Sequence, residues 1–95
     1  MEVAFSQMVA QVAKWCAERS DRVAMALVSL RSNKIVFYII PKGESFDFDL
    51  GFAQAKLDLF LNSFGTTGYA ETRQIPASEI ETFVPSGALR VWPKN

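Results

Sequence analysis

A segment near the middle of the chain, residues 46–64, is apolar on two opposite sides when it is drawn as an α-helix. Successive helical residues are turned by about 100°, and one side then collects Leu50, Ala53, Leu57, Phe60, Leu61 and Phe64. The opposite side collects Phe48, Phe52, Ala55 and Leu59. A surface helix needs only one apolar stripe. A helix over residues 48–63 must therefore be covered twice, by its own chain or by a partner.

An amphipathic helix is predicted over residues 3–20, ahead of this central segment. Its apolar face carries Phe5, Met8, Val9, Val12, Trp15 and Cys16. A narrower strip of small residues, Ala10, Ala13 and Ala17, would let another helix approach closely. We expect this strip to cover one apolar face of the central helix, although alanine is also simply a good helix former.

Two strands are predicted over residues 23–30 and 34–41, which are rich in β-branched and aromatic residues. A two-residue connection, Ser32-Asn33, would place Arg31 opposite Lys34 and so set the register of the hairpin. One face of the ribbon is then wholly apolar, and we expect it to face the core. Its residues are Ala24, Ala26, Val28, Leu30, Ile35, Phe37 and Ile39.

The other face of this hairpin is apolar at the end far from the turn. It carries Met25, Leu27, Val36, Tyr38 and Ile40. Left bare, such a patch would reach several hundred Å², which soluble monomers rarely expose. We therefore expect a partner, a ligand or another segment of the chain to cover it.

The remaining elements complete an α+β fold. A loop at residues 65–68 leads to a polar edge strand over 69–75, placed parallel to the second strand by a crossover through the central helix. A short helix over 78–84 and a last strand over 88–92 follow. The order α-β-β-α-β-(short α)-β predicts a two-layer sandwich, with a mostly antiparallel sheet of three or four strands and two main helices on one face. Residues 1–95 are expected to form a single domain.

Composition excludes several functions. Ten basic and ten acidic residues cancel, and the pI near 6.2 is unlike that of a nucleic-acid module. The chain has no histidine, and Cys16 is its only cysteine, so we expect no metal, no cofactor and no catalytic thiol. Cys16 lies on an apolar face and is expected to be buried. With no basic leader and no run of about 20 apolar residues, we expect a soluble, cytoplasmic protein that does not enter membranes.

These features favour a non-enzymatic protein that acts by association, as a homodimer or with another protein. The predicted interface is the sheet face of Met25, Leu27, Val36, Tyr38 and Ile40. A second set, Phe48, Phe52, Leu59 and Trp15, is the alternative interface or the lining of a pocket. The alternative function is binding of an apolar small molecule between the sheet and the central helix.

Overall fold

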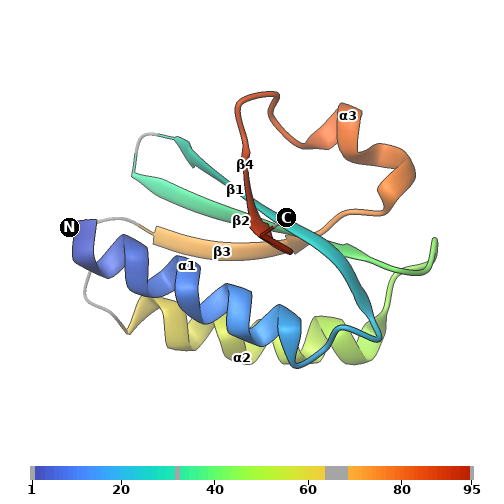
Figure 1. Ribbon diagram of the computed structural model, residues 1–95, viewed down its shortest axis with the longest axis horizontal. Helices are drawn as coiled ribbons and strands as arrows, with labels where there is room; N and C mark the ends of the chain where they lie inside the picture. The colour runs from blue at the N-terminus through green and yellow to red at the C-terminus, as the bar shows by residue number, and fades with distance from the viewer. Residues whose placement is uncertain (1, 32, 64–68, 95) are drawn as a thin grey trace.

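Four strands form one mixed sheet in the order β3-β2-β1-β4 in the computed structural model, which describes residues 2–31, 33–63 and 69–94. The strands are β1 (Val23–Arg31), β2 (Lys34–Pro41), β3 (Tyr69–Gln74) and β4 (Leu89–Trp92). The helices are α1 (Glu2–Ala17), α2 (Phe48–Asn62), the 3₁₀ turn η1 (Ala77–Glu79) and the single turn α3 (Ile80–Phe83). Both long helices lie on one face of the sheet (Figure 1), so the predicted α+β class is confirmed.

The hairpin has the register that a two-residue connection requires. Arg31 pairs with Lys34, and Phe37 pairs with Val28, as predicted; Ser32 itself lies outside the described residues. The register shifts between Val23 and Met25, because one extra residue bulges from β1 there. Val23 is consequently buried and Ala24 is exposed, so the prediction that Ala24 faces the core is wrong.

The two edge strands of the sheet are β3 and β4. β3 lies at one edge and runs parallel to β2, as the crossover predicts. β4 closes the other edge by pairing antiparallel with β1. The predicted loop at residues 65–68 and Phe64 lie outside the described residues.

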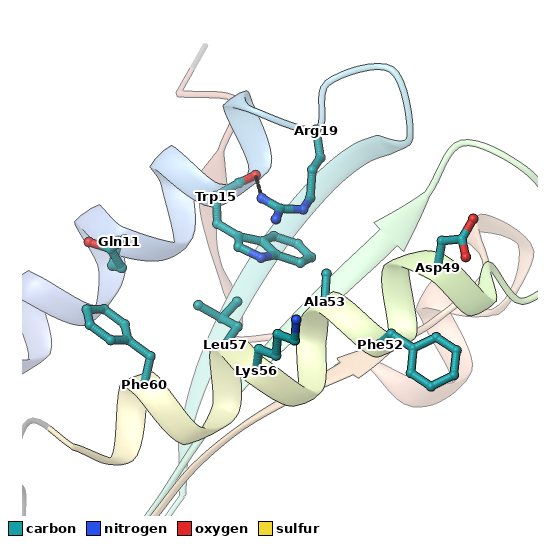
Figure 2. A pocket seen from close by; sticks show the side chains of 9 residues that line it. All are labelled: Gln11, Trp15, Arg19, Asp49, Phe52, Ala53, Lys56, Leu57 and Phe60. Carbon is teal, nitrogen blue, oxygen red and sulfur yellow. Dashed lines mark hydrogen bonds between the residues drawn. The ribbon is translucent and has the colours of Figure 1, made fainter.

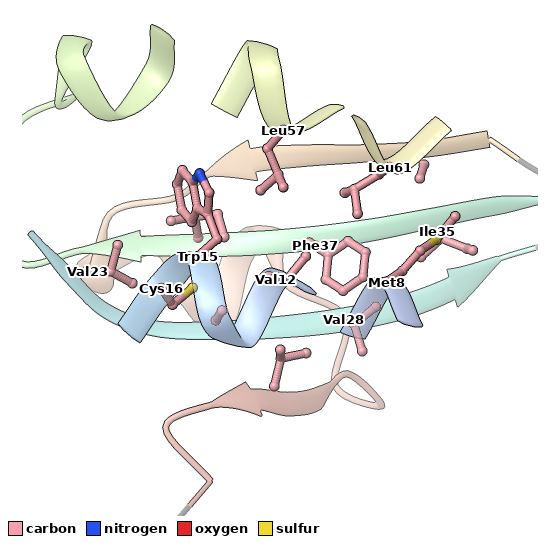
Figure 3. Packing of buried hydrophobic residues seen from close by; sticks show 14 of the residues in the cluster. Met8, Val12, Trp15, Cys16, Val23, Val28, Ile35, Phe37, Leu57 and Leu61 are labelled. Carbon is pink, nitrogen blue, oxygen red and sulfur yellow. The ribbon is translucent and has the colours of Figure 1, made fainter. Parts of the chain in front are cut away.

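The main core lies between the sheet and the two long helices (Figure 3). Phe37 on β2 is fully buried at its centre. The helices contribute Met8, Val12, Trp15, Cys16, Leu50, Leu57 and Leu61. Cys16 is buried, as its place on the apolar face predicts.

The second face of the sheet is covered by the chain's own C-terminal segment. Val36 and Tyr38 are each 4% exposed and pack with Val84. Leu27, Ile75, Ile80 and Ala88 are partly buried against this second cluster. Ile40 is also buried and Met25 half-buried. Residues 75–88, which carry η1 and α3, thus cover Leu27, Val36 and Tyr38, three of the five residues predicted as an interface, and the prediction is corrected for these three.

Candidate functional site

Helix α2 buries one of its two apolar faces and exposes the other. Asp47 begins the helix, since its carboxylate accepts a hydrogen bond of 3.1 Å from the backbone N–H of Leu50. Leu50, Leu57 and Leu61 are buried against the sheet. On the opposite side Phe48 and Phe52 are each 73% exposed and Leu59 is 78% exposed. We call the exposed set of Phe48, Phe52, Ala55 and Leu59 the outer stripe.

The first helix does not cover the outer stripe. Ala10 and Ala17 are exposed to solvent and only Ala13 packs against the core. The expectation that the alanine strip would cover one apolar face of α2 is therefore wrong. The reason is that the larger residues of α1 set its orientation, since Met8, Val12 and Trp15 turn toward the sheet.

Phe46 extends the apolar surface beyond the N-terminal end of α2. Its ring meets that of Phe48 edge to face, with the ring centroids 5.0 Å apart. A methyl group at position 51 would come within 2.9 Å of the Phe46 ring. Gly51 thus leaves the space in which Phe46 lies against the helix.

Two side-chain amides clamp the ends of α2 to β3. Gln74 accepts from the backbone N–H of Asp47 at 2.7 Å and donates to its carbonyl oxygen at 3.2 Å. Asn62 makes the same pair of bonds with the backbone of Ala70, at 3.0 and 2.8 Å. Between them, buried Gln54 donates to Thr72. These contacts hold α2 at a fixed rotation, so the outer stripe keeps facing solvent.

Asp58 and Glu71 lie near this interface, and the pKa values of their carboxyl groups are shifted in opposite directions. Burial raises the pKa of Asp58 above 3.8, although its two hydrogen bonds from Thr72 oppose the rise. Burial also acts to raise the pKa of Glu71, but Arg73 and Lys34 outweigh it and lower that pKa. Compared with the unfolded chain, the fold therefore disfavours the charged form of Asp58 and favours the charged form of Glu71.

We predict that Asp58→Asn raises the free energy of unfolding more at neutral pH than in acid. A folded pKa above the unfolded one means that the charged Asp58 costs stability, and this cost develops as the pH rises from about 3.9 through the folded pKa. The asparagine keeps the acceptor for Thr72 without the charge. Urea denaturation of variant and wild type across this pH range measures the difference.

Glu71→Gln is the matched control for this pH dependence. The lowered pKa of Glu71 stabilises the fold above the unfolded pKa, and that contribution disappears as the pH falls through the folded value. The variant should therefore lose more stability at neutral pH than in acid. A pH dependence of the same sign in both variants would contradict the assignment.

A groove of about 470 Å³ lies between α1 and α2, next to the outer stripe (Figure 2). Its lining is Gln11, Trp15, Arg19, Asp49, Phe52, Ala53, Lys56, Leu57 and Phe60. The Arg19 guanidinium lies 4.5 Å from the centroid of a Trp15 ring and donates to the Trp15 carbonyl oxygen. Of the predicted pocket residues, Trp15 and Phe52 line this groove, while Phe48 and Leu59 lie outside it. The groove separates two helices, and does not lie between sheet and helix as predicted.

Few groups in the described part of the chain are suited to chemistry. Burial raises the pKa of the Cys16 thiol to about 12, although Arg19 acts to lower it, so the reactive thiolate is scarce near neutral pH. Residues 2–31, 33–63 and 69–94 contain no cluster of three or more side chains that would hold a metal ion. The same residues form no helix long and apolar enough to span a bilayer.

Sequence reasoning found both faces of α2 but missed what holds the helix in place. The clamping amides of Gln74 and Asn62 look like ordinary surface residues in the sequence. The only signal was that Gln54, Asp58 and Asn62 follow one side of the helix, next to a strand rich in polar residues. The chain matches no protein-family model, and no similar curated protein or solved structure was found.

Proposed function

We propose that this chain acts by association, binding another protein surface through the outer stripe without catalysing a reaction. The observation that supports it is the exposure of Phe48, Phe52 and Leu59 on one side of a helix whose other side is buried. Single exposed apolar residues are common, but a contiguous group of large ones is typical of an interaction site.

The rigid attachment of α2 supports the same proposal. A surface that is held in its binding orientation loses little conformational entropy when a partner docks. The clamps by Gln74 and Asn62 limit rotation of the helix. Aromatic residues, the type to which exposed Phe48 and Phe52 belong, are also enriched at the cores of protein interfaces.

The proposal predicts that Phe52→Asp removes binding to the outer stripe and leaves the fold intact. We would measure binding of a hydrophobic fluorescent dye, together with molar mass by size-exclusion chromatography and light scattering at high micromolar concentration. Wild type should bind the dye, self-associate or both, and Phe52→Asp should do neither. Leu30→Asp is the control, because Leu30 is 62% exposed on β1, away from the stripe. A wild-type monomer that binds no dye would refute the proposal.

The second candidate function is binding of a small molecule in the groove between α1 and α2. Its volume of about 470 Å³ lies within the range of ligand pockets. Trp15 and Leu57 supply apolar surface, while Arg19 and Lys56 supply positive charge, which suits an aromatic carboxylate. Such compounds should raise the thermal midpoint of wild type and not of Ala53→Phe, which fills the groove. No rise at millimolar concentration would count against this function.

A further inference from the structure

We propose that the partner of the outer stripe is a second copy of the same chain, with the two α2 helices packed antiparallel about a two-fold axis. This inference rests on the proposed function, because it names the occupant of the same surface. Three observations support it: the spacing of the stripe residues, the charges beside them and the area that they expose.

The spacing of the stripe is the same when it is read in either direction. Phe48, Phe52, Ala55 and Leu59 follow at intervals of four, three and four residues. In an antiparallel pair Phe48 faces Leu59 of the second copy, and Phe52 faces Ala55. Large residues then lie opposite smaller ones along the whole contact, which keeps the helices at an even distance. A parallel pair would set Phe52 against Phe52 and leave a gap between the two alanines.

The charges beside the stripe also favour the antiparallel arrangement. Asp49 and Lys56 are two helical turns apart on the same side of α2, where both line the groove. A two-fold axis brings this side of one helix to the same side of the other. Lys56 then approaches Asp49 of the second copy, and this contact occurs twice. A parallel pair would bring this side against the opposite flank of the second helix, which carries Gly51 and Asp58, so Lys56 and Asp49 of the two copies would not meet.

Both charged groups remain accessible for an ion pair with a second copy. Lys56 forms no ion pair with the described residues of its own chain. Asp49 is 3.5 Å from Arg22, but its side chain is still 79% exposed. Lys56 of a second copy could therefore reach Asp49 without first breaking a buried contact.

The exposed area is near what a stable homodimer requires. The stripe extends over about 17 Å from residue 48 to residue 59, at 1.5 Å per residue. With Phe46 included, its large side chains present on the order of 500 Å² of apolar surface. The polar flanks bring the contact toward the roughly 800 Å² per partner of a standard interface.

Cross-linking of cysteine variants tests the arrangement directly. We would mix Phe48→Cys with Leu59→Cys, one of them carrying a mass tag, and add a short bismaleimide. The antiparallel pair predicts a cross-link between the two different variants as the main product. Leu59→Cys alone should give little, because the two sites would lie about 17 Å apart along the helices. Leu30→Cys is the surface control, and the native Cys16 is buried.

Exchange of the charges is a second test that leaves the stripe intact. Lys56→Asp should weaken dimerisation on the order of tenfold, because two attractive contacts become repulsive. Adding Asp49→Lys to the same chain should restore it. Efficient cross-linking of Leu59→Cys alone, or no recovery in the double variant, would overturn the antiparallel pair. A monomeric wild type whose dye binding is lost in Phe52→Asp would overturn the dimer and leave the proposed function standing.

Discussion

Val36→Asp should remove a large part of the stability of the fold, although its position was predicted from the sequence to face a partner. Val36 is 4% exposed and packs with Tyr38 and Val84 under the C-terminal segment. An aspartate there would be desolvated among apolar side chains and would lie opposite Glu71, the β3 residue that pairs with position 36. It would either unfold the site or bind a proton. We expect a loss of about 3–5 kcal/mol in the free energy of unfolding. A domain of this size is stable by only about 5–15 kcal/mol in total.

Leu59→Asp is the matched control, because it places the same charge on an apolar residue that is 78% exposed. Its free energy of unfolding should stay within about 0.5 kcal/mol of wild type in dilute solution. Urea denaturation followed by circular dichroism measures both variants. If Val36→Asp folded normally and only lowered the molar mass in solution, the sheet face would be an interface after all.

The misplaced interface shows what periodicity alone leaves undetermined. The alternation along β2 predicts correctly that Val36 and Tyr38 share a face and that this face needs a cover. The covering residues Ile75, Ile80 and Val84 belong to a segment with only a 3₁₀ turn and one helical turn. The spacing of Ile80 and Val84 predicts that the segment has an apolar side, but so short a pattern does not reveal which face of the sheet it covers.

The local features that the sequence predicts well are set by neighbouring residues. The hairpin register and the burial of Cys16 each follow from short-range chemistry or a regular pattern. The bulge at Ala24 and the amide clamps of Gln74 and Asn62 depend on contacts between distant segments. For the outer stripe, helical spacing predicts which residues share one side of α2. It does not predict that this side is exposed to solvent.

Phe37→Ala and Phe52→Ala make the same chemical change and should have opposite consequences. Phe37 is fully buried at the centre of the core, so its truncation removes apolar contacts and leaves a cavity. The expected loss is about 3–5 kcal/mol in the free energy of unfolding. Phe52 is 73% exposed, and its truncation should cost no more than about 0.5 kcal/mol in dilute solution.

The concentration dependence of unfolding separates the two roles further. If the outer stripe joins two copies, mass action makes the wild-type unfolding midpoint rise with protein concentration. Phe52→Ala should reduce that rise while keeping the midpoint measured at high dilution. Phe37→Ala should lower the midpoint at every concentration. Urea titrations at several concentrations measure both effects, and an equal loss in the two variants at high dilution would mean that Phe52 supports the fold and not an association.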